Sequence, residues 1–239
     1  ESAQNVVLEF TSFPMPGLSV RVRVCSHPGE EIRLFCDVGN QTDAYVEFVE
    51  FPDVTVPNDL VGTGGKSHIF WPFTEGCVVE DATLRTNYYP IKYPNKGWEG
   101  YYPGPVQMQF MSYYDDSAGL YFASHDPHAT TKGIEYHLTN GGIRLEYRMF
   151  LAIAPHTDYV MDFPMVLGAI DDSWYGAAEK YRRWLRSETD FLPPPFSRTK
   201  ACPHGMTMHR WSSCIRCGDK RTPGTCRPMA SSPTQTPSR

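Results

Sequence analysis

Short stretches in which apolar and polar residues alternate follow one another through the first 154 residues. Residues 20–25 read VRVRVC, residues 32–38 read IRLFCDV and residues 45–51 read YVEFVEF. Such a period of two is typical of β-strands that bury one face. Further strands are expected at residues 106–113, 119–124, 133–138 and 143–154. No helical period separates these stretches, so the sequence predicts an all-β, twisted antiparallel β-sandwich and not a βαβ fold.

One turn signal is especially clear. Residues 137–142 read HLTNGG and lie between two of the expected strands. Asn-Gly and Gly-Gly adopt positive φ angles at little cost, as a tight hairpin requires. We therefore expect the strands on either side to pair as a β-hairpin.

The apolar period changes after residue 173. The apolar positions that follow have the spacing of one helical face: Trp174, Ala177, Ala178, Tyr181, Trp184 and Leu185. Asp172 or Ser173 is well placed to cap the first turn. We expect one amphipathic helix over residues 173–187, inside a linker of residues 169–192 that leads towards another domain.

Residues 193–239 differ in composition from everything before them. They contain eight of the 22 Lys and Arg residues but one of the 27 acids, together with eight of the 21 Pro and four of the seven Cys. The formal net charge of −5 therefore combines about −12 before residue 193 with +7 after it. Any function is expected to reside in residues 1–192.

The tail admits three interpretations. Cys214-x-x-Cys217, with Cys202, His204, His209 and Cys226, has the spacing of zinc ligands, but a second Cys pair and a packing core are missing. A disordered basic segment also fits the composition. The third interpretation, which we favour, is a shifted reading frame. Codons for residues 203–230, read two bases later, can encode an apolar strand bounded by turn residues. We expect no stable secondary structure and no bound metal in the tail.

Charge and cysteine content exclude some classes of protein. The pI is about 5.9 and residues 1–192 lack clustered cations, so no nucleic-acid partner is expected. No run approaches the roughly 20 apolar residues of a membrane span, so no membrane partner is expected. The chain begins at Glu1 without a signal-peptide pattern, which suggests a processed or excised piece. Cys25 and Cys36 lie in neighbouring expected strands and could pair, although buried free thiols are favoured.

Two regions of the sequence are specific enough to compare with a known family. One reads YPGPVQMQF at residues 102–110, then YDD at 114–116, GLYFASHD at 119–126 and Lys132. The other reads FPMVLG at residues 163–168 and DSWYGAAEKYRRW at 172–184. Together they resemble the end of the N-terminal region of large bacterial glycoside hydrolases, in which a galactose-mutarotase-like supersandwich precedes a (β/α)8 barrel. The resemblance covers about residues 20–187, and its helix resembles the connector between the two domains.

The resemblance implies a role in carbohydrate metabolism. Residues 1–168 would form the supersandwich without its first strands, and the partners would be carbohydrate and the chain's own barrel. Catalytic carboxylates of such enzymes lie on the barrel, which is absent where the resemblance ends, so the chain is expected to be an inert accessory fragment. The alternative is a free-standing carbohydrate-binding module. No cofactor is expected, and both the bacterial cytoplasm and export remain open as locations.

Candidate site residues divide into acids and carbohydrate contacts. Adjacent acids at 115–116 and 171–172 are interpreted as turns and caps, because a glycosidase needs carboxyls about 5–10 Å apart, and so no catalytic residue is assigned. Aromatic faces and planar polar groups bind sugars. The candidates are Trp98, Tyr101 and Tyr102 in the segment 95–105, interpreted as a loop, and His125, Asp126 and Lys132. Packing in a small core and stabilisation of a turn are the competing interpretations.

Overall fold

A computed structural model of the chain describes residues 5–27, 31–57, 60, 66–80, 97–139, 141–171 and 173–189. The chain divides into two units, Glu1–Pro193 and Pro194–Arg239, and every described residue lies in the first. The expectations for the tail, including the zinc site and the shifted frame, therefore lie outside the described residues.

The larger sheet of the described part has nine strands, and all of its paired neighbours are antiparallel. Its order is β1-β2-β3-β13-β9-β8-β5-β6, and β12 also pairs with β3. The bounds are β1 (Asn5–Phe10), β2 (Leu18–His27), β3 (Glu31–Asn40), β5 (His68–Trp71), β6 (Cys77–Glu80), β8 (Phe110–Tyr114), β9 (Gly119–Ser124), β12 (Thr157–Tyr159) and β13 (Met165–Ile170).

The smaller sheet has the order β4-β11-β10-β7. Its strands are β4 (Val49–Pro57), β7 (Gly97–Tyr102), β10 (Lys132–Thr139) and β11 (Gly142–Met149). Strands β10 and β11 form the expected hairpin, with Thr139 opposite Gly142 and Gly141 at a φ of 102°. A Cβ on Gly142 would lie 2.4 Å from the Val56 carbonyl oxygen, so the close approach of β4 also requires glycine there.

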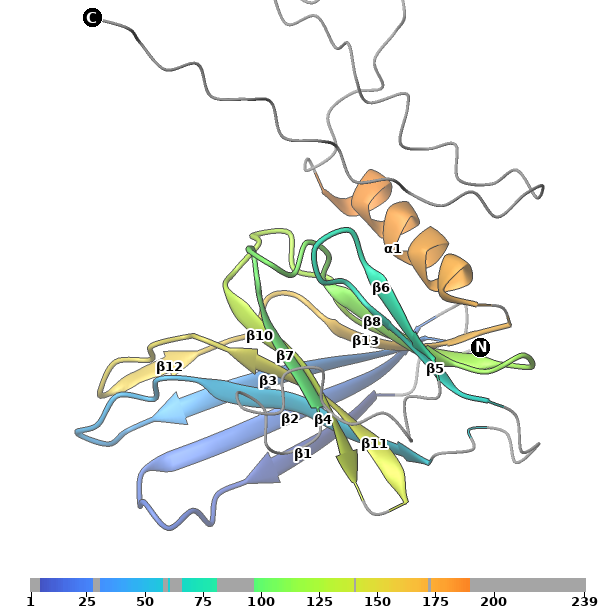
Figure 1. Cartoon of the computed structure of the whole chain (residues 1–239). Helices are drawn as coiled ribbons and strands as arrows, with labels where there is room; N and C mark the ends of the chain where they lie inside the picture. Colours follow the sequence, from blue (N-terminus) through green and yellow to red (C-terminus); the bar gives the residue numbers. More distant parts are fainter. Residues whose placement is uncertain are drawn as a thin grey trace, which may run out of the picture. The chain divides into compact units, whose positions relative to one another are not determined.

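The two sheets lie against each other (Figure 1), and apolar residues of both form one core between them. Strand β11 shows why: Ile143, Leu145 and Tyr147 are buried in this core, and the alternate residues Arg144, Glu146 and Arg148 belong to the opposite face. The period of two in the sequence thus becomes one face packed on the other sheet and one face that carries charge.

Helix α1 (Trp174–Glu188) packs across the other face of the large sheet, on β8 and β9 (Figure 1). Ser173 caps it, since its side chain accepts a hydrogen bond from the backbone N–H of Tyr175. Ala177, Tyr181 and Trp184 are buried in a second core that includes Phe110 and Tyr121 of the sheet. The central strands are therefore covered on both faces, and every residue of β8 is buried.

The sandwich and its single described helix confirm the expected fold class, and the helix matches the expected range to within one residue at each end. The expected bounds of three strands were wrong: β4 is Val49–Pro57 and not 45–51, β8 begins at Phe110 and not at 106, and β11 ends at Met149 and not at 154. The segment 95–105, interpreted as a loop, contains β7. Strands such as β5 and β13 were missed because they place apolar residues in the cores on both faces of the large sheet, which removes the alternation that marks a strand.

Cys25 and Cys36 do not form a disulfide. Cys25 stands opposite Arg33, and Cys36 stands opposite Val22, so the two thiols are three positions out of register. Both cysteines are free, as is Cys77, which confirms the interpretation as free thiols, but of these three only Cys36 is buried.

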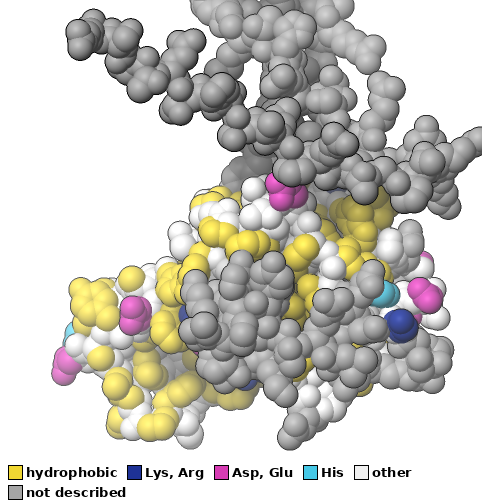
Figure 2. Space-filling model, viewed as in Figure 1, with side chains coloured by type: hydrophobic (Ala, Val, Ile, Leu, Met, Phe, Trp, Pro, Cys, Tyr) yellow, Lys and Arg dark blue, Asp and Glu magenta, His cyan; other side chains and the backbone are white. Residues whose placement is uncertain are grey.

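Strand β1 gives the large sheet an apolar edge. Val6, Val7, Leu8 and Phe10 are all exposed. Figure 2 shows hydrophobic side chains, in yellow, gathered at the lower left, over the end of the sheet that carries β1 and β12. Among the described strands none pairs with the outer side of β1, and an apolar edge strand of this kind can pair with a further strand.

Candidate functional site

Lys132 lies at the centre of a polar network inside the protein, and its side chain is 0% exposed. Its ammonium donates three hydrogen bonds, to Gln109 Oε1 at 2.7 Å, to Asp126 Oδ2 at 2.8 Å and to the Thr130 carbonyl at 2.7 Å. It also lies 5.1 Å from the ring centroid of Tyr102. All three N–H groups have acceptors, so the buried charge is stabilised within the protein.

Asp126 is the counter-charge, and it is equally buried. Its Oδ1 accepts a hydrogen bond from the backbone N–H of His128 at 2.8 Å, and its Oδ2 accepts one from that of Thr130 at 2.8 Å. Burial raises the pKa of Asp126, but the Lys132 ammonium and these hydrogen bonds outweigh it and hold the pKa below its ordinary value. Asp126 therefore stays ionised and organises the turn before β10.

His125, the residue before, faces helix α1. Its Nε2 lies 2.8 Å from the Tyr121 hydroxyl, and its ring stacks on Trp184 with centroids 4.6 Å apart and planes within 10°. Burial, followed by the charges of Arg33 and His27, lowers the pKa of His125 to about 3. The imidazole is neutral at physiological pH and is held between the sheet and the helix.

Gln109 connects these groups to the helix. Its side-chain amide donates to the Asp126 carbonyl at 3.0 Å, and its backbone N–H donates to the Tyr181 hydroxyl at 3.2 Å. The Tyr147 hydroxyl donates to the Gln109 carbonyl at 3.0 Å. Residues from both regions of the resemblance, 102–132 and 163–184, thus meet under α1. Gln109 and Tyr147 were missed, although Gln109 lies within the YPGPVQMQF stretch.

The three aromatic candidates all lie in β7, an edge strand that pairs with β10. Tyr102 is buried at the Lys132 network, whereas Tyr101 is 45% exposed and donates a hydrogen bond to Glu99. The backbone of Trp98 stands opposite Tyr136. With Asp126, Lys132 and His125 also buried, Tyr101 is the candidate whose described side chain can meet a ligand directly. Carbohydrate contact by any of the six stays a prediction.

A row of acids crosses the outer face of the small sheet. Strand register places one acid of each strand side by side: Asp53, Glu146, Glu135 and Glu99. The Arg148 guanidinium lies 3.2 Å from Glu135 and 3.5 Å from Glu99, and it also reaches Glu50 at 2.9 Å. Burial and the charge of Glu50 raise the pKa of Glu146. The row was not expected, because strands distant in sequence bring it together.

Asp115 makes a turn, as expected. Its Oδ1 accepts hydrogen bonds from the backbone N–H groups of Ser117 at 2.7 Å and Ala118 at 3.0 Å, whereas its buried Oδ2 has no partner among the described residues. Asp172 lies outside the described residues. Beside Asp115 is a cavity of about 370 Å³. Its lining is His68, Val78, Tyr114, Asp115, Asp116, Ser173 and Trp174.

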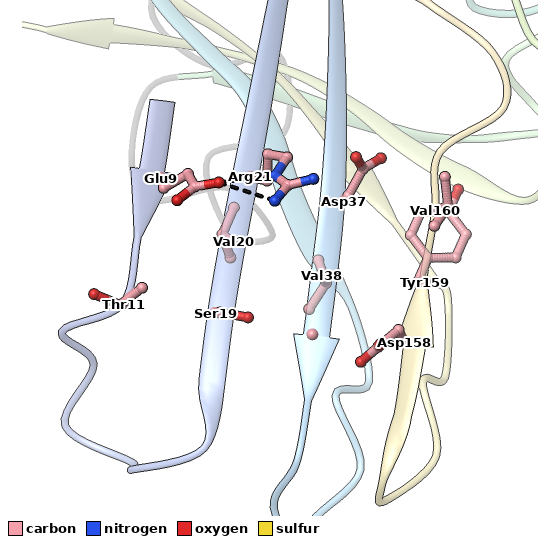
Figure 3. Close-up of a pocket in the computed structure, with 11 residues that line it drawn as sticks. Glu9, Thr11, Ser19, Val20, Arg21, Asp37, Val38, Asp158, Tyr159 and Val160 are labelled. Atoms are coloured by element: carbon pink, nitrogen blue, oxygen red, sulfur yellow. Dashed lines mark hydrogen bonds and ion pairs between the residues drawn. The ribbon is translucent and has the colours of Figure 1, made fainter. Parts of the chain in front are cut away.

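Another cavity, of about 340 Å³, lies over β1, β2, β3 and β12 (Figure 3). Glu9 and Arg21 form an ion pair of 2.9 Å at its rim, and Asp37 is held by Arg23 at 3.0 Å. Gly39 forms part of the floor, where a Cβ would lie 2.4 Å from Ser19 Oγ. These charges already have partners, so the groove offers little unsatisfied polarity to a ligand.

Within the described ranges, no three His, Cys, Asp or Glu side chains are grouped so that they could hold a metal ion. In the same part of the chain, no helix combines the length and the apolar character needed to cross a membrane.

The fold and the network define a class of protein: an antiparallel β-sandwich with a helix fixed to one sheet by a buried polar network. Solved structures similar to the chain include the α-galactosidase of Lactobacillus brevis, at 12% identity and a TM-score of 0.49, covering 77% of this chain and 25% of that one. The GH36 α-galactosidase AgaB of Geobacillus stearothermophilus is similar at 12% identity and a TM-score of 0.46, over 72% and 24% of the two chains.

The α-N-acetylgalactosaminidase NagBb of Bifidobacterium bifidum is similar at 10% identity and a TM-score of 0.47, over 77% of this chain and 30% of that one. The chain therefore spans between about a quarter and a third of the length of these glycoside hydrolases. No family model matches the sequence, and no curated protein matches it.

Proposed function

We propose that this chain is the accessory β-sandwich region of a glycoside hydrolase and that helix α1 connects it to a catalytic (β/α)8 barrel. The observation that carries the proposal is the network under α1. Gln109 and Tyr181 are 72 residues apart and belong to the two regions that resemble the family, yet they are hydrogen-bonded inside the protein. Lys132 and Asp126 belong to the same network, and His125 stacks on Trp184 of the helix. Buried, directional contacts of this kind fix the angle of a helix, which is what a connector to a second domain requires.

The sandwich by itself is proposed to be catalytically inert. A general acid or base must reach the substrate and exchange a proton near the working pH. Asp126 is fully buried and paired with Lys132, and His125 is neutral down to about pH 3. Neither group can therefore serve as the acid or base of glycoside hydrolysis in this arrangement.

Two measurements test the proposal. The purified 239-residue chain should hydrolyse aryl glycosides no faster than buffer does, and activity abolished by Asp126→Asn would overturn the inert assignment. The gene should carry codons for a barrel beyond those for Ser187, in the shifted frame. An intact frame in independent clones, with no barrel codons after it, would reject the connector role.

A free-standing carbohydrate-binding module is the second candidate, and the cavity at the start of α1 favours it. Trp174 is 39% exposed there and stacks on Phe70 with centroids 5.5 Å apart. Asp115 Oδ2 and His68 Nδ1 have no hydrogen-bond partner among the described residues. An aromatic face beside planar polar groups suits the two faces of a sugar ring. Tyr101, on the outer face of the small sheet, offers a second contact.

The two candidates differ in what they predict for sugar binding. Calorimetric titration of the full chain with a panel of mono- and oligosaccharides should show binding if the chain is a module. Trp174→Ala should then remove that binding, whereas Tyr175→Ala, at the next and more exposed position, should retain it. An accessory region without a carbohydrate site would bind none of the panel.

A further inference from the structure

A cavity of about 200 Å³ lies between the start of β3 and the last turns of helix α1. It is separate from the cavity at the start of the helix and from the groove in Figure 3. Its lining comes from both elements and from the turn after β9: Glu31, Arg33, His125, Lys180, Arg183, Trp184, Ser187 and Glu188. Most of these side chains are charged, which is unusual for a space between a sheet and a helix.

The cations of the cavity outnumber its carboxylates. Lys180 lies 3.5 Å from Glu31, and Arg33 lies 3.6 Å from Glu188. These contacts are ion pairs at more than hydrogen-bonding distance, so they leave N–H donors unused. Arg33 Nε is buried and has no hydrogen-bond partner among the described residues. Arg183 supplies a third positive charge, so the lining has three cationic side chains and two carboxylates.

His125 adds a neutral donor. It is 4% exposed, and its Nδ1 is buried without a partner among the described residues. Its Nε2 contacts the Tyr121 hydroxyl, whose pKa is raised well above its ordinary value, chiefly by burial, so the hydroxyl keeps its proton. When that hydroxyl donates to Nε2, the imidazole proton must lie on Nδ1. A buried N–H without an acceptor is costly, and an anion in the cavity would supply the acceptor.

We propose that this cavity is a binding site for a small oxyanion, either a carboxylate or a phosphate group. Arg33 Nε–H and His125 Nδ1–H donate hydrogen bonds to its oxygens, and Lys180 and Arg183 balance its charge. The depressed pKa of His125, to which Arg33 contributes, agrees with a positive potential at this place. A bound anion links β3 to the end of α1 and so stabilises the helix against the sheet. This site does not depend on the proposed enzyme context.

Anion titrations of the full chain test the proposal. Inorganic phosphate and acetate are each titrated against chloride at constant ionic strength, and binding is measured by calorimetry and by the rise in melting temperature. Saturable binding of at least one of them is expected. Binding of phosphate alone, of acetate alone or of both identifies which oxyanion the cavity accepts. Absence of saturable binding by either overturns the proposal.

Variants of the lining supply the controls. Arg33→Gln should weaken binding about tenfold or more, because it removes a charge-assisted donor. Arg183→Gln, at a more exposed position, should weaken binding about threefold. Arg182→Gln is the matched control, since Arg182 is the next residue of the helix, pairs with Glu179 and does not line the cavity. Equal weakening in this control would indicate diffuse charge attraction and reject the site.

The tautomer gives an independent readout. In ¹⁵N-labelled protein, His125 should carry its proton on Nδ1, and that proton should shift and exchange more slowly as the anion is added. An unprotonated Nδ1 in the anion complex would contradict the proposed donor.

Discussion

Replacing Lys132 with Met tests how strongly the buried network holds the two motif regions together. Methionine keeps most of the length of the side chain but removes the ammonium and its three hydrogen bonds of 2.7–2.8 Å. Asp126 would then keep its backbone donors but lose its counter-charge, and Gln109 Oε1 would lose its hydrogen bond from the ammonium. Breaking a buried ion pair by removing one partner costs about 3–5 kcal/mol.

The free energy of unfolding should therefore fall by about 3–5 kcal/mol, a large part of the roughly 5–15 kcal/mol of a typical domain. At about 2–4 °C per kcal/mol for a domain of this size, the melting temperature should fall by about 6–20 °C. Urea unfolding, followed by tryptophan fluorescence and near-ultraviolet circular dichroism, measures the free energy by linear extrapolation.

The parent protein and the Lys132→Met variant should also differ in how their stability depends on pH. The folded-state pKa of Asp126 is below its ordinary value, so its contribution to stability is present above the unfolded pKa of 3.8 and is lost as the pH falls through the folded pKa. Without Lys132, burial would instead raise the folded pKa of Asp126, and protonation of Asp126 at low pH would remove the unpaired buried charge. Below about pH 5 the variant should therefore lose less stability than the parent, or gain some.

A double variant completes the experiment. Asp126→Asn combined with Lys132→Met leaves no unpaired charge and should recover part of the lost stability. A loss below about 1 kcal/mol in Lys132→Met, or an unchanged pH slope, would refute the view that this ion pair fixes the network.

Three further predictions concern the helix, the histidine and a thiol. Trp184→Ala should cost about 3–5 kcal/mol and should speed amide hydrogen exchange in α1 while the β10–β11 hairpin stays protected; equal exchange in both would contradict separate docking of the helix. The pKa of His125 is lowered from 6.5 to about 3, so its contribution to the free energy of unfolding is complete above the unfolded pKa of 6.5 and is lost as the pH falls towards 3. In His125→Gln the free energy of unfolding should therefore fall less steeply between these pH values than in the parent protein. Burial and the charge of Asp37 raise the pKa of Cys36 to about 11, so a thiol reagent at pH 8 should label Cys36 only after unfolding, and rapid labelling of the native protein would contradict its burial.

The elements that depend on local sequence were the most predictable. The alternation of residues 20–25 and 32–38 places apolar side chains on one face wherever the strand pairs, and β2 and β3 contain both stretches. The Asn-Gly-Gly turn closes the β10–β11 hairpin because positive φ is a property of the turn residues themselves. The helix was also predictable from local sequence, because apolar residues follow Trp174 at helical spacing and Ser173 caps the first turn.

The site depended on tertiary structure. The sequence singled out His125, Asp126 and Lys132, but only tertiary packing decided that Asp126 and Lys132 are buried in a network with Gln109. The packing of α1 on β8 and β9 likewise decided that His125 is buried against Trp184. Alternation could not predict β5 and β13, because these strands place apolar residues in the cores on both faces of the large sheet. The acid row across the small sheet likewise depends on the register between strands far apart in the chain.

A local sequence pattern predicts which face of a helix or strand is apolar, because the side-chain directions follow from the backbone geometry of that element. It does not predict which residue of an element distant in sequence will lie opposite a given residue, because the free energy of packing the whole fold decides this pairing. The sequence of this protein therefore determined the strands that bury one face, such as β2 and β3, together with the hairpin and the helix. The tertiary structure alone decided the strands without alternation and which polar groups meet beneath that helix.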